Sequence, residues 1–291
     1  MIFGLGAAIG WGLADLWAAM SGRRIGSGRT VVAAQVTAAL ALSAIVLVAR
    51  PDLGRLDAVI GWLLPNALLT AAAYATLYRA LELGPVAVVS PVLASYAVIP
   101  VLLAVVLLGE TLGPWETMGV AVTIAGAVLT STDIRALRAG TAARPAGLRL
   151  AVVSTLLFGV ATYVMGWASQ RAGYLSSLWF GRITTALVFV IAVAVVRVRS
   201  RPGAGADAER GSGGRAALGF AAAVGLVDLL GGLSYVRGAE VGLVSIVTAA
   251  SATYPVIPVL GGVLLFQERP AANQYVGVAM VIGGLVLLGL G

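Results

Sequence analysis

The sequence predicts an all-α integral membrane protein with ten transmembrane helices arranged as two inverted five-helix repeats. Three observations lead to this prediction. The 291 residues are 60% hydrophobic and 11% charged, and their mean hydropathy is +1.00, whereas an average soluble domain has about 25% charged residues. The apolar runs are about 20 residues long, which is the length that crosses a hydrocarbon core as a helix. The second half of the chain also repeats the first.

The apolar runs define the predicted helices. Short connections between several runs make neighbouring helices antiparallel, and the long runs exclude a β-barrel, whose strands alternate polar and apolar residues. In chain order, the predicted spans are 2–21, 31–49, 58–79, 85–108, 114–132, 149–169, 175–196, 216–236, 241–266 and 273–290.

The repeat is clearest from residue 79 to residue 129. About 22 of these 51 positions are identical to the residue 158 places later, including the pairs Arg79/Arg237, Tyr96/Tyr254 and Gly119/Gly277. An offset of 147 relates the earlier spans and pairs Gly12 with Gly159. The offset grows because of an insertion at 197–215, a segment rich in Gly, Ala, Ser and Arg that we expect to be a flexible linker.

The predicted repeats are therefore 1–132, with spans one to five, and 149–291, with spans six to ten. A connecting loop, 133–148, joins them. Because five is an odd number, the two halves must lie upside down relative to each other. Inverted repeats of this kind are typical of secondary transporters, whose substrate site lies near the midplane of the bilayer.

Composition excludes several kinds of chemistry. The chain has no Cys, no His and no Lys, so it offers no disulfide, no imidazole base and no phosphate-binding P-loop. We expect no cofactor, no metal and no enzymatic activity. The net charge of +7 comes from Arg in the connections, which favours a membrane protein without a nucleic-acid partner. The first apolar run lacks a basic n-region, so we expect a retained span and not a cleaved signal peptide.

The arginines also bear on orientation. Apart from Arg182, 14 follow odd-numbered spans and 4 follow even-numbered spans. The positive-inside rule then places both termini outside the cytoplasm.

Several motifs resemble the EamA-type transporters of the drug/metabolite transporter superfamily. Leu107-Leu108-Gly109-Glu110-Thr111-Leu112, followed by Gly119 and Gly126, resembles the end of their repeat. The second half offers Gln267-Glu268-Arg269, followed by Gly277 and Gly284. Trp11-Gly12 in the first span resembles the family's early Trp-Gly, and Gly181-Arg182 in the seventh span resembles its Arg near the start of that helix.

The resemblance implies a transporter of small organic solutes such as amino acids, nucleosides or drugs. We expect an exporter, with import of a sugar or similar neutral metabolite as the alternative. The family commonly has cytoplasmic termini, which is opposite to the arginine distribution. Gln35 stands where the first half would carry a second intramembrane arginine.

Charged residues inside predicted spans are the first candidates for the transport pathway. A charge near the bilayer centre costs at least about 2.5–3.5 kcal/mol, so Asp15, Arg182 and Asp228 should face the protein interior. A carboxylate here could carry protons or contact a cationic substrate. The alternative is a fixed ion pair between Arg182 and a carboxylate that orders the helices. The repeat equivalents of Asp15 and Asp228 are Thr162 and Thr70. Because the charge is present in one half only, we expect the aspartates to have a specific function and not a general structural role.

The fourth and ninth spans should bend around a central cavity, because proline removes a backbone hydrogen bond. Tyr96 and Tyr254 would point into that cavity; the alternative is that these tyrosines and prolines only shape the core. The expected hinges are Pro91, Pro100, Pro255 and Pro258. The remaining candidates for the substrate or proton pathway are Gln35, Asn66, Trp11 and Trp179.

Other residues favour structural roles. Glu110 and Glu268 each precede a predicted helix, so we expect their carboxylates at the positive end of that helix's dipole. Arg237 and Glu240 are spaced for a local ion pair.

The expected partners are a small-molecule substrate, protons as a candidate coupling ion, and the lipid bilayer of a bacterial-type plasma membrane. Either a monomer or a homodimer fits. The rival functions are a lipid-modifying membrane enzyme, for which the sequence offers no nucleophile or metal cluster, and a non-transporting sensor or scaffold.

Overall fold

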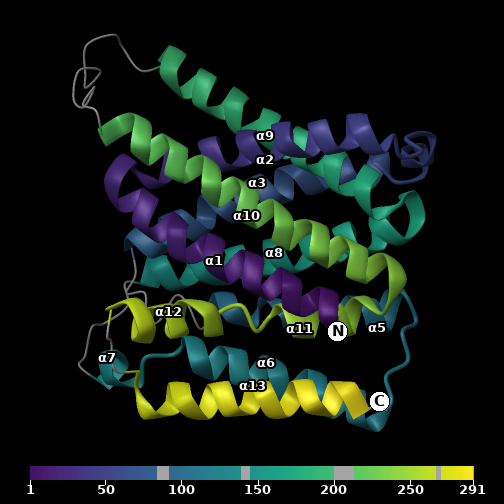
Figure 1. Ribbon diagram of the computed structural model, residues 1–291, viewed down its shortest axis with the longest axis vertical. Coiled ribbons are helices and arrows are strands. Elements are labelled where there is room, and N and C mark those ends of the chain that lie inside the picture. Colours follow the sequence, from purple (N-terminus) through teal and green to yellow (C-terminus); the bar gives the residue numbers. More distant parts are fainter. Residues whose placement is uncertain (84–91, 139–144, 200–212, 267–269, 291) are drawn as a thin grey trace.

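A computed structural model describes residues 1–83, 92–138, 145–199, 213–266 and 270–290. The helices lie side by side, and both termini are at the same end of the molecule (Figure 1). The helices are α1 (Ile2–Ile25), α2 (Ser27–Ala49), α3 (Ile60–Leu83), α5 (Val98–Leu107), α6 (Pro114–Ser131), α7 (Ile134–Arg138), α8 (Pro145–Ala172), α9 (Tyr174–Arg199), α10 (Gly213–Val241), α11 (Val244–Ser251), α12 (Val256–Phe266) and α13 (Ala272–Leu290), with 3₁₀ turns η1 (Gly54–Ala58) and η2 (Ser95–Ala97).

Each predicted span overlaps helical structure, but some boundaries were wrong. The predicted linker 197–215 is helical at both ends, since α9 continues to Arg199 and α10 begins at Gly213; residues 200–212 lie outside the described residues, so the linker itself stays a prediction. The predicted loop 133–148 contains α7 and the first turn of α8, which starts at Pro145. Proline is favoured at a helix start because its missing N–H has no partner there in any case. The length of an apolar run does not predict helix ends that continue into polar residues.

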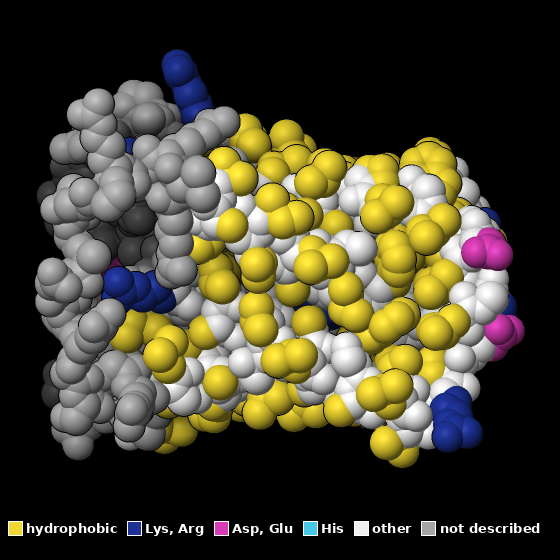
Figure 2. Space-filling model, turned by 90° about the horizontal axis from the view of Figure 1, so that it is seen from above, with side chains coloured by type: hydrophobic (Ala, Val, Ile, Leu, Met, Phe, Trp, Pro, Cys, Tyr) yellow, Lys and Arg dark blue, Asp and Glu magenta, His cyan; other side chains and the backbone are white. Residues whose placement is uncertain are grey.

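The surface is suited to lipid. Large apolar side chains are strongly exposed, among them Leu47, Val48 and Leu264 at 76%, 86% and 77%. Figure 2 shows hydrophobic side chains covering the side of the molecule, with charged side chains gathered mainly toward its ends. Within the described residues, six helices are individually long and apolar enough to cross a membrane. The fourth and ninth predicted spans are not among these six because they are broken into shorter helices such as α5, α11 and α12.

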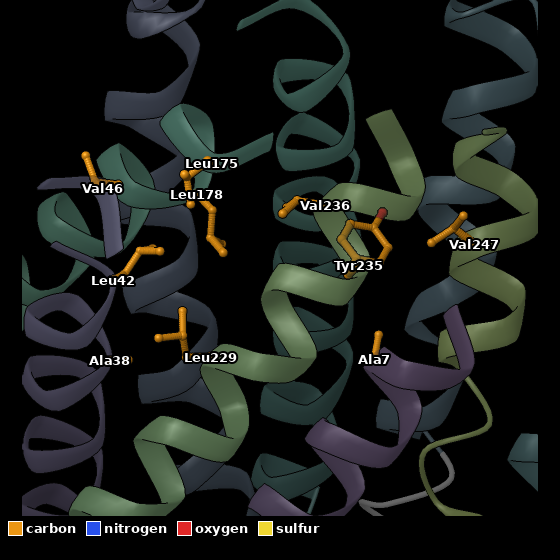
Figure 3. Packing of buried hydrophobic residues seen from close by; sticks show 10 residues of the cluster. All are labelled: Ala7, Ala38, Leu42, Val46, Leu175, Leu178, Leu229, Tyr235, Val236 and Val247. Carbon is orange, nitrogen blue, oxygen red and sulfur yellow. The ribbon is translucent and has the colours of Figure 1, made fainter. Parts of the chain in front are cut away.

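Helix α10 lies at the centre of the largest buried cluster. Leu229, Tyr235 and Val236 of α10 pack with residues of α1, α2, α9 and α11 (Figure 3). Helix α10 therefore links helices from both sequence halves through one apolar core.

The halves pack through each other, not as separate bodies. In the first half, α1 runs antiparallel to α10, with Gly6 against Ser234 and Gly10 against Gly231. Helix α8 runs antiparallel to α3 in the same way, and the Ser154 hydroxyl donates to the Ala73 carbonyl at 2.9 Å. By the repeat, α8 corresponds to α1 and α3 to α10, so the two pairings correspond as well.

Helices α6 and α13, which also correspond by the repeat, pack against each other at one edge of the molecule (Figure 1). Gly119 lies against Gly284, and Gly126 lies against Gly277. A Cβ atom on Gly126 would come within 2.7 Å of the Val281 amide nitrogen. These glycines allow the backbones to touch, which is how transmembrane helices commonly associate.

Gly284 and its neighbour Gly283 offer a matched test of this packing. A Cβ on Gly284 would lie 2.3 Å from the Thr123 hydroxyl oxygen and 2.6 Å from its amide nitrogen, whereas one on Gly283 meets nothing within 4 Å. We expect Gly284→Ala to destabilise the protein by about 1–3 kcal/mol through overpacking. Gly283→Ala should leave the thermal unfolding midpoint in detergent unchanged or raise it. Equal midpoints for the two variants would contradict this packing.

Candidate functional site

Helix α1 crosses the chain where the ninth predicted span is broken. Tyr254 donates its N–H to the Ser251 carbonyl, and Ile257 donates to Tyr254, so the helix tightens to 3₁₀ spacing around Pro255. A Cβ on Gly12 would lie 2.7 Å from the Tyr254 carbonyl oxygen. Glycine at this position therefore lets α1 rest directly on the interrupted backbone.

The fourth span has the same arrangement. A Cβ on Gly159 of α8 would lie 2.5 Å from the Ile99 side chain, and both residues correspond by the repeat to Gly12 and Ile257. Pro100 and Pro258 are each the third residue of a helix, α5 and α12, where a missing N–H costs no intrahelical bond. Pro91 lies outside the described residues.

The two equivalent tyrosines meet between the broken spans. The Tyr96 and Tyr254 ring centroids are 6.3 Å apart with the planes tilted by 52°. Tyr96 is buried, and its hydroxyl is in hydrogen-bonding contact with Ser251. The pair thus joins η2 to the segment that connects α11 and α12.

An ion pair connects α9 to α10. The Arg182 guanidinium lies 2.6 Å from the Asp228 carboxylate, and both side chains are mostly buried, at 13% and 16% exposure. The Tyr74 hydroxyl also contacts Arg182. A Cβ on Gly232, one turn after Asp228, would lie 3.0 Å from a guanidinium nitrogen, so the arginine rests on bare helix backbone. The cost of removing Arg182 and Asp228 from water is thereby offset by their mutual attraction and by the hydrogen bonds of the guanidinium.

Gln35 completes the coordination of Arg182. It is buried on α2, and its side-chain oxygen accepts a hydrogen bond from Arg182 at 3.2 Å. By the repeat, Gln35 is the counterpart of Arg182 itself, so the two equivalent residues touch. Two arginines at this distance would repel each other, which gives a physical reason for glutamine here.

Asp15 is exposed, yet its accessible surface does not face the lipid. On α1, Trp11 and Ala8 lie one and two turns before it on the same face, and Ala8 is only 3% exposed. The lipid-facing residues Ile9 and Met20 lie on the opposite side of the helix, at 53% and 36% exposure. We infer from this exposure that a hollow lies beside Asp15 inside the protein.

The residues within electrostatic range of Asp15 are Asp228, Tyr96 and Tyr254. Among the described residues, Asp15 forms no ion pair and no hydrogen bond. Three candidates from distant parts of the sequence thus lie around Asp15.

The other predicted residues lie around this centre. Trp11 packs on Tyr235 with ring centroids 5.5 Å apart. Trp179 donates its indole N–H to the Ser43 hydroxyl at 3.0 Å and packs in the apolar core. Asn66 is 2% exposed, and its side-chain oxygen has no partner among the described residues.

Sequence reasoning missed three residues of the site: Tyr74, Gly232 and Tyr235. Tyr235 is buried and its hydroxyl contacts Thr248 at 3.1 Å. Gly232 could have been found from its spacing, since it follows Asp228 by one helical turn and lies on the same face.

Glu110 caps a helix, but not the one expected. Its carboxylate accepts hydrogen bonds from the Val244 and Ser245 amides at 2.6 and 3.0 Å, and from the Ser245 hydroxyl at 2.5 Å. It therefore caps α11 in the other half of the chain. The expected helix, α6, supplies its own acid, because Glu116 accepts from the Gly113 amide at 2.7 Å.

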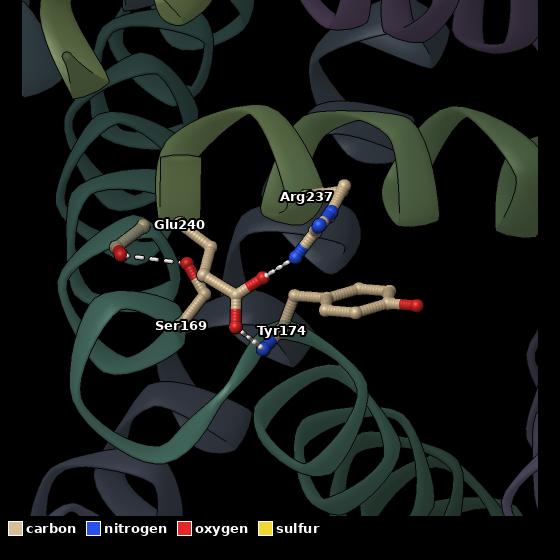
Figure 4. A network of polar contacts seen from close by, with 5 residues as sticks. Ser169, Tyr174, Arg237 and Glu240 are labelled. Carbon is tan, nitrogen blue, oxygen red and sulfur yellow. Dashed lines mark hydrogen bonds and ion pairs between the residues drawn. The ribbon is translucent and has the colours of Figure 1, made fainter. Parts of the chain in front are cut away.

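The predicted ion pair between Arg237 and Glu240 is present at the end of α10 (Figure 4). Glu240 also accepts a hydrogen bond from the Tyr174 amide at 3.2 Å. The pair is thus part of a structural junction between α10 and the start of α9.

Comparison with known proteins identifies the family. The EamA-like transporter family matches residues 1–132 and 145–290. The chain belongs to that family. It is therefore an integral, multi-pass membrane transporter of the drug/metabolite transporter superfamily. One protein of known crystal structure is 18% identical, with a TM-score of 0.67 over 98% of this chain and 97% of that one, which supports the fold alone. No curated protein matches.

Removal of Arg182 from this EamA-family transporter should be costly, because Asp228 would remain buried without a cation. We expect Arg182→Gln to destabilise by about 3–5 kcal/mol, the usual effect of breaking a buried pair from one side. The double variant with Asp228→Asn should recover most of that loss. Thermal unfolding of all four proteins in detergent gives the coupling energy, and additive effects would show that the pair is not coupled.

Proposed function

We propose that this protein is a secondary transporter that exports small organic solutes, such as amino acids, nucleosides or drugs, across a bacterial-type plasma membrane by alternating access. The observation that carries the proposal is that Asp15 is exposed on the face of α1 opposite the lipid-facing residues, close to where α1 crosses the broken ninth span at Tyr254. Discontinuous helices that surround a site near the midplane are the usual construction of such transporters.

We further propose that ten spans form two inverted five-helix repeats. The support is that corresponding residues lie opposite one another: Gly119 packs on Gly284, and their counterparts Gly277 and Gly126 pack on each other. Equivalent residues also meet at Gln35–Arg182 and Tyr96–Tyr254. A pseudo-two-fold axis in the membrane plane would produce this pattern.

Thermal-shift screening of metabolites on purified protein, followed by counterflow in liposomes, tests transport. We expect at least one small organic solute to raise the unfolding midpoint and to exchange across the membrane. Protons are the proposed coupling ion, so an imposed pH gradient should drive net flux. Flux that does not depend on the pH gradient would exclude proton coupling. Uptake of a neutral sugar would favour the importer alternative. The absence of exchange for every stabilising solute would contradict transport.

The locations of the arginines favour termini outside the cytoplasm. Both termini lie at one end of the molecule (Figure 1), together with the even-numbered connections, which carry 4 arginines against 14 in the odd-numbered ones. We expect a C-terminal alkaline phosphatase fusion to be active and a C-terminal green fluorescent protein fusion to be dark. A bright fluorescent fusion with inactive phosphatase would reverse the orientation.

A further inference from the structure

The charges around the hollow do not balance. Arg182 already binds Asp228 at 2.6 Å and Gln35 at 3.2 Å, and it rests on Gly232. The positive charge of Arg182 is therefore already neutralised by Asp228 within the protein. Asp15 has no cationic partner among the described residues, and the charged group that acts on it there is another carboxylate, Asp228. The cluster keeps an excess of one negative charge when both aspartates are ionised.

The hollow is accessible from the carboxylate side. Asp15 is exposed although Ala8, two turns before it on the same face of α1, is buried. A carboxylate that faced lipid would be costly, and Asp15 points away from the lipid-facing residues Ile9 and Met20. Space therefore exists next to this carboxylate inside the protein.

The side chains beside Asp15 also include two aromatic rings. Tyr96 and Tyr254 both lie within electrostatic range of Asp15, and their centroids are 6.3 Å apart. Trp11, one turn before Asp15 on the same face, is partly exposed. The faces of tyrosine and tryptophan attract cations, and aromatic groups with a carboxylate suit quaternary or alkylated ammonium groups.

We propose that the hollow binds a monovalent organic cation, with its charged nitrogen against Asp15 and its substituents against Tyr96 and Tyr254. This inference rests on the proposed transport function and specifies its substrate class. A divalent metal ion would need about six oxygen ligands, whereas the described surroundings of Asp15 are mainly aromatic. An anionic solute would meet an unpaired carboxylate and a cation that is already neutralised.

Asp15 and Asp228 differ in their roles under this proposal. Asp228 neutralises Arg182 and positions the site, whereas Asp15 contacts the ligand. Their equivalents by the repeat are Thr162 and Thr70, so the equivalent positions of the other half carry no carboxylate. The cation should accordingly bind on the α1 side of the hollow.

Calorimetry on the full-length protein in detergent tests the proposal with two probes of the same shape. Phenyltrimethylammonium carries a permanent charge that cannot be lost as a proton, and tert-butylbenzene is its uncharged isostere. We expect the cation to bind and the isostere to bind at least tenfold more weakly. Asp15→Asn should weaken cation binding at least tenfold, while Asp15→Glu should stay within a few-fold of the parent.

Matched controls separate binding from folding. Asp57→Asn removes a carboxylate from the exposed turn η1 and changes the net charge equally, so it should bind as the parent does. Tyr254→Phe keeps a ring and should retain binding, whereas Tyr254→Leu should lose severalfold. Thermal unfolding identifies any variant that fails to fold, and the Asn and Glu variants at position 15 should unfold near the parent.

Three outcomes would overturn the inference: no cation binding by the parent protein, equal affinity for the two probes, or unchanged affinity in Asp15→Asn. Counterflow distinguishes these from failure of the transport proposal. Exchange of a neutral or anionic solute without cation binding would support the transport proposal and contradict the cation site. Cation binding without exchange of any solute would do the reverse.

Discussion

Close approach between helix backbones at glycines is the constraint on which this structure depends. Lipid removes the hydrophobic drive that brings helices together in water, so contact must come from van der Waals packing of small residues. Gly10 brings α1 onto α10 at Gly231, and Gly12 brings it onto the broken ninth span at Tyr254. These two contacts fix the rotation of α1. Asp15 follows within one turn, so the same packing that holds the helix also directs its carboxylate inward.

The ion pair shows why charge in a bilayer is informative. Arg182 would be very costly in the low dielectric without compensation, and Asp228, Gln35 and Gly232 together supply charge, an acceptor and room. The sequence offered two interpretations, a fixed ion pair and a carboxylate that acts in transport, and each fits a different aspartate. The fixed ion pair belongs to Asp228, and the carboxylate left for other work is Asp15.

The sequence predicted helical structure in each apolar run, because membrane thickness sets helix length. The inverted arrangement of the two repeats stays a prediction. The sequence predicted the partners of those helices poorly. Glu110 was assigned to the next helix in the chain, although its carboxylate caps α11 of the other half. Contacts between residues more than a hundred positions apart depend on how the halves interleave, and no local pattern encodes that. Tyr235, which packs on Trp11, was missed for the same reason.

The departures from symmetry carry the chemical argument. In the inverted arrangement that we propose, Gln35 and Arg182 meet at the axis, where two arginines would repel and two glutamines could not balance Asp228. One member of the pair therefore had to differ from the other. Asp15 has no such explanation, since its counterpart Thr162 is uncharged and no basic partner for Asp15 is present among the described residues. A frame built from equivalent halves can open to either side. Under the proposed alternating access, the unpaired carboxylate of Asp15 would favour a cation in both open states, so the charge would select the cargo while the gradients set its direction.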